Sequence, residues 1–198
     1  MKLVLDWDGT VTVRDTQWML LERFGDAEVF ERTSAGLGTT LSFREVMEQQ
    51  VGSVRAPLDE AVAFLLAEAE VRKGFAELAR RFAPTILSSG FHETIEPLLA
   101  REGVELDVVA NHVDPRPDGW RVLWSDAAAC TECGDLCKRR ALPGEGPVVY
   151  VGDGYSDRCA ALAADRVFAR RALADYLVSR NLPFEGFETF DDVAAALT

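Results

Sequence analysis

The sequence lacks any run of basic residues, and its acidic residues outnumber its basic ones. It carries 33 Asp and Glu against 21 Lys and Arg, which gives a formal net charge of -12 at pH 7. A surface of this sign repels the phosphates of nucleic acids and of acidic lipids. We therefore expect no nucleic-acid partner and no acidic membrane partner.

Long apolar stretches are also missing. Every apolar run stays well below the roughly 18 residues that suggest a membrane-spanning helix, so no membrane partner is expected. The N-terminal segment lacks the extended apolar region of a secretion signal. From these absences we expect a soluble protein of the cytoplasm.

Cysteine is scarce, with four residues in the chain. Without a secretion signal, a framework of disulfides is not expected. Cys130, Cys133 and Cys137 lie in the segment "CTECGDLC", and their spacing leaves two interpretations open. They are reduced thiols packed beside one another, or they form a separate Zn²⁺ site whose fourth ligand comes from Cys159 or from a histidine.

Apolar residues are abundant enough for a folded core, since 48% of the 198 residues are hydrophobic. Short segments rich in Val, Ile and Leu predict buried strands at residues 2–6, 84–89, 106–111, 147–152 and 165–170. Segments with helical periodicity lie between them. Strands that alternate with helices predict an α/β fold, in which helices flank both faces of a Rossmann-like parallel sheet.

The segment from residue 13 to residue 71 departs from this alternation. It shows helical periodicity in three places and contains no predicted strand. We therefore expect a small α-helical domain at 13–71, inserted after the first strand, and a core formed by residues 1–12 and 72–198. A turn and a short hairpin strand are expected at 114–124.

Acidic and hydroxyl side chains gather where the predicted strands end. Three strands are followed by such groups: Asp6 and Asp8 after the first, Ser88, Ser89 and Gly90 after the second, Asp153 and Asp157 after the one at 147–152. Ligands of open parallel sheets bind beyond the carboxyl ends of the strands. We therefore expect these groups to surround one crevice.

Four carboxylates in one crevice repel one another unless a cation offsets their charge. An all-oxygen set of this kind suits Mg²⁺, which proteins hold with one or two carboxylates and with substrate phosphate. Ser88 and the N–H groups of the helix predicted from His92 can hold phosphate oxygens, and Lys138 supplies positive charge. The set therefore predicts Mg²⁺-assisted phosphoryl transfer.

The motifs "DWDGT", "LSSG", a lysine and "GDGYSD", in this order, resemble those of the haloacid dehalogenase (HAD) superfamily of phosphatases. They extend from residue 6 to residue 157. The inserted helices resemble the C1 cap of subclass IB, the phosphoserine-phosphatase-like branch. The resemblance therefore implies a HAD-like catalytic core beneath a helical C1 cap, and a hydrolase of phosphoric monoesters.

The resemblance also implies a function for each residue of these motifs. Asp6 is expected to be the nucleophile that becomes an aspartyl-phosphate. Asp8 is expected to be the general acid, oriented by Thr10. Asp153 contacts the metal directly, and Asp157 supports the metal shell from outside. The full expected sets are Asp6, Asp8 and Lys138 for catalysis; Thr10, Asp15, Ser88, Ser89 and Gly90 for phosphate and substrate; Asp6, Asp8, Asp153 and Asp157 for Mg²⁺.

Within the superfamily, "GDGYSD", the pair Cys137-Lys138 and "VFARRALADYL" are similar to the MtnX-like branch. Its members include the 2-hydroxy-3-keto-5-methylthiopentenyl-1-phosphate phosphatase of methionine salvage. Phosphoserine phosphatase is an alternative. Asp15 takes the position of the glutamate that meets the amino group in those enzymes, but Gln50 stands where they carry a carboxylate-binding arginine. Phosphoethanolamine or phosphocholine phosphatase is a further alternative.

A cap over the crevice excludes large substrates, so the expected partner is a small-molecule phosphate ester. We expect a monomer or a homodimer. Two other functions stay open: a catalytically silent ligand sensor on the same fold, and a transferase that passes the phosphoryl group to an acceptor other than water.

Overall fold

The computed structural model describes residues 1–198. A seven-stranded sheet lies at its centre, in the order β4-β3-β2-β1-β5-β6-β7. The strands are β1 (Lys2–Leu5), β2 (Thr85–Phe91), β3 (Val108–Asp114), β4 (Arg121–Leu123), β5 (Val148–Gly152), β6 (Arg166–Ala169) and β7 (Glu185–Gly186). Every neighbouring pair is parallel except β3 and β4, which form the expected hairpin. The predicted α/β fold with a parallel sheet is confirmed.

Residues of the central strands alternate between two hydrophobic clusters, as strands buried on both faces require. In β1, Leu3 and Leu5 belong to the larger cluster and Val4 to the smaller one, and β5 and β6 alternate in the same way. The larger cluster includes residues of α5 (Phe75–Phe82), α6 (His92–Arg101) and α9 (Phe190–Ala196). The smaller one includes residues of α7 (Arg158–Ala161) and α8 (Arg171–Ser179). The helices thus cover both faces of the sheet.

Four helices lie between β1 and β2 in the chain: α1 (Thr16–Phe24), α2 (Ala27–Gly36), α3 (Phe43–Val51) and α4 (Leu58–Glu68). Periodicity predicts α1, α3 and α4, but it does not predict α2, which buries only Thr33 and Gly36. A capping residue marks the start of α2, since the Asp26 carboxylate accepts hydrogen bonds from the N–H groups of Glu28 and Val29.

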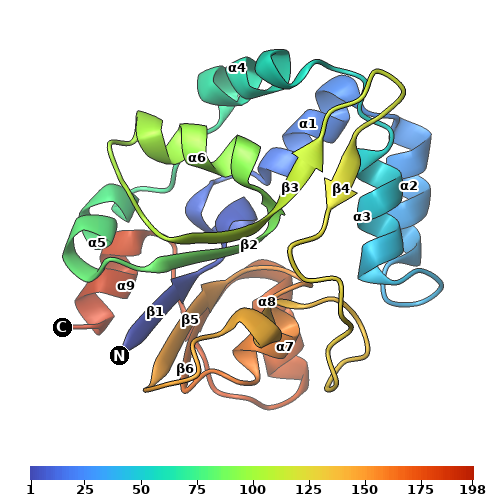
Figure 1. The fold of residues 1–198 in the computed structure, drawn as a ribbon. Coiled ribbons are helices and arrows are strands. Elements are labelled where there is room, and N and C mark those ends of the chain that lie inside the picture. The colour runs from blue at the N-terminus through green and yellow to red at the C-terminus, as the bar shows by residue number, and fades with distance from the viewer.

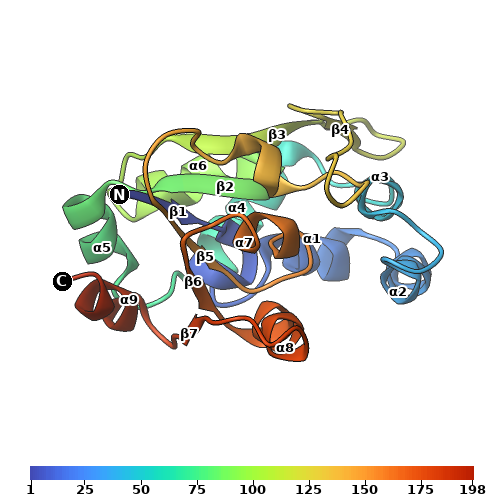
Figure 2. The ribbon, with the colours of Figure 1, turned by 90° about the horizontal axis from the view of Figure 1, so that it is seen from below.

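The two ends of this helical insertion run side by side. Thr12 and Val71 form an antiparallel bridge, and the N–H of Val13 donates to the carbonyl of Glu70 at 2.9 Å. We propose that α1 to α4 form the cap, with residues 13–71 as its extent. Both ribbon views show α2 and α3 on the side of the molecule away from the two chain termini (Figures 1 and 2).

The helices are all short. The longest, α4, has 11 residues, and none combines the length and apolar character that crossing a membrane requires.

Candidate active site

The site begins where β1 ends, in the middle of the sheet between β2 and β5. Asp6 follows β1 directly and is 4% exposed. The chain then makes a single wide turn, η1 (Trp7–Val11), in which Gly9 has a φ of 77°. A Cβ at Gly9 would collide with the Asp153 carboxylate. A glycine is therefore what allows this turn to lie against the end of β5.

The guanidinium group of Arg72 holds the same turn. Arg72 is 7% exposed and donates to the carbonyls of Thr10 at 2.7 Å, Gly9 at 2.9 Å and Thr12 at 3.2 Å. Buried carbonyls need such donors. Sequence reasoning missed Arg72, because an isolated arginine carries no signal of where its side chain points.

Lys138, the first residue of the short helix η2 (Lys138–Ala141), is buried between two carboxylates. It is 4% exposed, and its ammonium group donates to Asp6 and, at 2.6 Å, to Asp157. Burial lowers the pKa of Lys138, but the charges of Asp157 and Asp6 raise the pKa above its usual value. The side chain therefore stays positively charged beside Asp6.

Both carboxylate oxygens of Asp157 accept hydrogen bonds from protein donors. Oδ1 accepts from Lys138 and from the Tyr150 hydroxyl at 2.7 Å. Oδ2 accepts from the N–H groups of Gly154 at 2.8 Å and Asp153 at 3.0 Å. A carboxylate used in this way has little capacity left for an ion, so Asp157 fixes Lys138 and the loop after β5. Tyr150 is a second contributor that sequence reasoning missed.

Carboxylate oxygens of Asp6, Asp153 and Asp157 all lie within 4.8 Å of one another. Burial and the charge of Asp157 raise the pKa of Asp6 well above its usual value. The same two causes raise the pKa of Asp153 to about 6. A divalent cation reverses this mutual destabilisation, and an all-oxygen donor set fits Mg²⁺. Asp6 and Asp153, which keep free acceptor capacity, are the carboxylates suited to contact it.

The carboxylate of Asp8 is held by the first residue of α1. The N–H of Thr16 donates to Asp8 Oδ1 at 2.8 Å, and the Thr16 hydroxyl donates to the same oxygen. Burial raises the pKa of Asp8, and the hydrogen bonds from Thr16 only partly offset this. A carboxyl group with a raised pKa is suited to hold and deliver a proton.

The expectation that Thr10 orients Asp8 is wrong. The Thr10 hydroxyl donates to Asp153 Oδ1 at 3.4 Å instead, because the turn at η1 places Thr10 against the end of β5. Thr10 thus contacts Asp153, a carboxylate suited to contact a metal ion. Thr16, rather than Thr10, holds the Asp8 carboxylate in place.

Ser88, Ser89 and Gly90 lie in the last half of β2, immediately before α6 begins. The Ser88 hydroxyl oxygen accepts from the N–H of Gly90 at 2.9 Å, so its own proton is free for another acceptor. A Cβ at Gly90 would lie 3.1 Å from Asp8 Oδ2. The ends of β1 and β2 therefore contact each other, as neighbouring parallel strands should.

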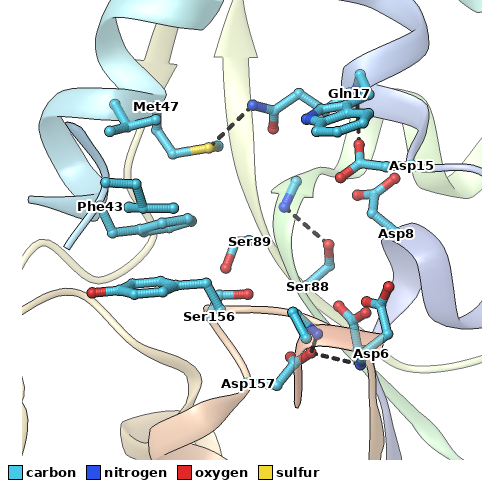
Figure 3. A pocket seen from close by; sticks show the side chains of 18 of the residues that line it. Asp6, Asp8, Asp15, Gln17, Phe43, Met47, Ser88, Ser89, Ser156 and Asp157 are labelled. Atoms are coloured by element: carbon cyan, nitrogen blue, oxygen red, sulfur yellow. Dashed lines mark hydrogen bonds between the residues drawn. The ribbon is translucent and has the colours of Figure 1, made fainter. Parts of the chain in front are cut away.

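One cavity of about 570 Å³, a size suited to a small organic ligand, is lined by Asp6, Asp8, Ser88, Lys138, Asp153 and Asp157. Figure 3 shows Asp6, Asp8 and Asp157 on one wall, while Phe43 and Met47 of α3 lie on the facing wall. The acidic wall comes from the strand ends and the facing wall from the inserted helices. A ligand held there would contact both parts of the chain.

The amide of Gln50, at the position considered for an arginine, does not carry a charge into the cavity. It donates to the hydroxyls of Thr33 at 3.0 Å and Ser34 at 3.2 Å. Arg14, which also lines the cavity, is paired with Glu22 at 2.7 Å. The local chemistry at Gln50 is therefore that of neutral hydrogen-bonding groups.

Asp15 lines the cavity and caps α1, since its carboxylate accepts from the N–H of Trp18 at 2.8 Å. Burial and the nearby charge of Asp8 raise the pKa of Asp15 to about 8. This shift favours the protonated form of the Asp15 carboxyl, the form that can donate a hydrogen bond.

The cysteines form a group of their own. Cys130, Cys133 and Cys137 line no part of the 570 Å³ cavity, although Cys137 precedes Lys138 in the chain.

Comparison with known proteins identifies relatives along the full chain. The sequence profile of the haloacid dehalogenase-like hydrolases matches residues 3–162. A polyol phosphate phosphatase of Saccharomyces cerevisiae is 30% identical over an alignment of 217 positions, which covers 97% of this chain and 90% of the yeast protein. A 2-hydroxy-3-keto-5-methylthiopentenyl-1-phosphate phosphatase of Bacillus cereus is 29% identical over an alignment of 210 positions, which covers 100% of this chain and 95% of the relative.

Solved structures share the fold. A phospho-aspartyl intermediate analogue of phosphoserine phosphatase has a TM-score of 0.71 at 15% identity and covers 98% of both chains. A phosphoserine phosphohydrolase-like protein from Francisella tularensis has a TM-score of 0.70 at 19% identity over 100% of both chains. At these identities the likeness concerns the fold, and it confirms the predicted HAD-like architecture.

Proposed function

The chain belongs to the haloacid dehalogenase-like hydrolase family and is a phosphatase of that family, and we propose that it hydrolyses a small phosphate ester with Mg²⁺ through an aspartyl-phosphate on Asp6. The arrangement around Asp6 carries this proposal. Its buried carboxylate contacts the ammonium group of Lys138 and lies within 4.8 Å of the Asp153 carboxylate. A phosphate group that enters the cavity meets a nucleophile, a fixed cation and a metal-binding oxygen together.

In the first step, a carboxylate oxygen of Asp6 attacks phosphorus. The P–O bond to the alcohol breaks as the new bond to Asp6 forms, and the carboxyl proton of Asp8 moves to the leaving oxygen. The raised pKa of Asp8 supports this assignment. Lys138 balances the charge of the phosphoryl oxygens, and the free proton of the Ser88 hydroxyl can be donated to one of them.

In the second step, water attacks the phosphorus of the aspartyl-phosphate. Asp8, now a carboxylate, takes a proton from this water, and the bond between phosphorus and Asp6 breaks. Inorganic phosphate leaves, Asp6 is again a carboxylate, and Asp8 is again protonated. The hydrogen bonds from Thr16 keep Asp8 in one place through both steps.

The proposed Mg²⁺ ligands are the side chains of Asp6 and Asp153 and the backbone carbonyl of Asp8, with Asp157 as an outer support. When bound, Mg²⁺ offsets the negative charge that the phosphate brings to this acidic wall. The free acceptor capacity of Asp153, apart from the 3.4 Å bond from Thr10, supports it as a direct ligand.

The proposed substrate is an MtnX-like one, 2-hydroxy-3-keto-5-methylthiopentenyl-1-phosphate or an ester of similar size. Phe43 and Met47 provide an apolar wall opposite the acids, which suits a methylthio group. The neutral amide of Gln50, bonded to Thr33 and Ser34, offers no cation for a carboxylate. The two arginines that line the cavity, Arg14 and Arg171, lie beside Glu22 and Asp153 instead. This argues against phosphoserine, whose carboxylate would lack a free cation at Gln50.

The test measures phosphate release from a panel of metabolite esters, with and without Mg²⁺. The panel includes the methylthiopentenyl ester, polyol phosphates, phosphoserine, phosphoethanolamine and phosphocholine. We expect Mg²⁺-dependent release, and a loss of more than about a thousandfold in kcat for Asp6→Asn. Asp118→Asn is the matched control, because Asp118 is exposed and pairs only with Arg121.

Each alternative has its own outcome. An Asp6→Asn variant at the wild-type rate would refute the nucleophile. Phosphoserine as the best substrate would refute the inference from Gln50. Binding of esters without phosphate release would favour the sensor, and a phosphorylated acceptor among the products would favour the transferase.

A further inference from the structure

The four cysteines converge on one point at the surface of the core. Their Sγ atoms all lie within 4.8 Å of one another, and those of Cys130 and Cys159 are 3.9 Å apart. None of the four is in a disulfide. We propose that Cys130, Cys133, Cys137 and Cys159 bind one Zn²⁺ ion in a tetrahedral structural site.

The spacing of the sulfur atoms fits this ion. A tetrahedral Zn²⁺ with Zn–S bonds of about 2.3 Å places its sulfur ligands about 3.8 Å apart. The Cys130–Cys159 pair, at 3.9 Å, is close to this separation, and no two of the four sulfur atoms are more than 4.8 Å apart. Four sulfur ligands leave no coordination position for water or substrate, which is typical of structural rather than catalytic zinc.

The backbone around the first two cysteines is folded to present both thiols to one ion. The N–H of Gly134 donates to the carbonyl of Cys130 at 2.8 Å, and the N–H of Cys130 donates to the carbonyl of Asp135 at 2.9 Å. Gly134 has a φ of 74°, a conformation that glycine adopts without strain. This tight loop returns the chain just after Cys133, so that Cys130 and Cys133 lie on the same side.

The segment that carries three of the ligands has no regular structure, and hydrogen bonds at Ser125, Asp126 and Asp135 join it to the rest of the chain. Residues 125–137 contain no helix and no strand, and most of them are exposed. Cys130 is an exception at 3% exposure. Cys133 is exposed and Cys137 is partly buried. A metal crosslink explains why the loop still brings all three thiols together, because the loop itself supplies too small a core.

The fourth ligand, Cys159, would let the ion link two segments that carry residues of the active site. Cys137 is followed directly by Lys138, and Cys159 comes two residues after Asp157. The ion would therefore tie the segment bearing Lys138 to the start of α7, where Asp157 accepts the Lys138 hydrogen bond at 2.6 Å. This consequence for Lys138 rests on the proposed phosphatase function, whereas zinc binding itself does not.

The test is the metal content of the full-length protein, purified without added metal or chelator. Elemental analysis is expected to give about one Zn²⁺ per chain. Replacement by Co²⁺ should produce the intense visible spectrum of a tetrahedral thiolate site. Cys133→Ser and Cys159→Ser should each lower the zinc content by more than half. Asp153→Asn, which alters the separate carboxylate group, should keep the full zinc content.

Zinc-free protein that shows no thiolate spectrum with Co²⁺, iron in place of zinc, or a disulfide between Cys130 and Cys159 would each overturn the proposal. The measurement on the unaltered protein stands even if a cysteine variant fails to fold. Because zinc content is measured without substrate, a failure of the phosphatase proposal leaves this result untouched. Given both proposals, the cysteine variants that fold should also lose phosphatase rate, because Lys138 is then less firmly placed.

Discussion

Asp8 depends on a residue eight positions further along the chain. The hydroxyl and the N–H of Thr16 both donate to Asp8 Oδ1, and Thr16 is only 2% exposed. These two bonds fix the direction of the carboxyl group that is proposed to move a proton twice in each turnover. Thr16 contacts Asp8 and does not line the cavity, so we expect it to act by positioning.

Replacing Thr16 by Val removes the hydroxyl while keeping the shape of the side chain and the backbone N–H. We expect kcat to fall about tenfold, as for other residues that orient a site from outside, with little change in KM. Steady-state kinetics on the best ester of the panel measures both. Thr16→Ser restores the hydroxyl and should recover most of the rate, and equal rates for the Val and Ser variants would exclude the positioning function.

The position of a single residue can be predicted where strand order alone decides it. Asp6, Asp8 and Asp153 follow strands that are neighbours in a parallel sheet, so their proximity follows from the fold. The orientation of Thr10 does not, because it depends on the φ of 77° at Gly9 within a single turn. Thr16 and Tyr150 were not predicted because their hydrogen bonds depend on how a helix and a strand are rotated about their own axes.

At the scale of elements, the turn η1 depends on a side chain that arrives after the inserted helices. Arg72 follows Val71, which pairs with Thr12 where the two ends of the insertion meet. Its guanidinium donates to two carbonyls of the turn, those of Gly9 and Thr10, and to the carbonyl of Thr12 just after it. Arg72 thereby joins the end of the helical insertion to the turn η1 that follows Asp6. A change in the pairing of Thr12 with Val71 would move the turn η1, and Asp8 lies within this turn.

Replacing Arg72 by Met keeps the apolar stem of the side chain and leaves these buried carbonyls without a donor. We expect the free energy of unfolding to fall by about 3 kcal/mol, since each unsatisfied buried acceptor costs about 1 kcal/mol or more. Urea unfolding measures this change. Arg80→Met is the control, because the Arg80 side chain is 58% exposed, and an equal loss in both variants would contradict the argument.

Element prediction from the sequence follows the strength of the local pattern. The apolar strands and the periodic helices α1, α3 and α4 were predicted because a buried face repeats along each of them. Helix α2 has only two buried residues, and β7 has only two residues in all, both exposed. Tertiary contacts rather than local pattern determine such elements, so no sequence period predicts them.

At the scale of the whole molecule, a chain with a net charge of -12 concentrates part of that charge at the buried end of its central strands. Lys138 pairs with Asp6 and Asp157, and the Asp153 carboxylate lies within 4.8 Å of both acids without contacting this ammonium group. Arg171, at 3.7 Å from Asp153 and half exposed, offsets little of the remainder because water screens it. Without a divalent cation, repulsion among these carboxylates therefore destabilises the folded state, and a bound cation would remove this destabilisation.

We accordingly expect Mg²⁺ to raise the thermal midpoint of unfolding of the full chain. A ligand that binds only the folded state at about 100 times its dissociation constant adds about 2.7 kcal/mol, which corresponds to a rise of roughly 5–10 °C for a protein of this size. Calorimetry with Mg²⁺ and with NaCl of equal ionic strength separates binding from charge screening. Asp153→Asn should lose most of the Mg²⁺-specific rise. A rise of the same size in that variant, or in NaCl alone, would show that the cation acts elsewhere than at the carboxylates beyond β1 and β5.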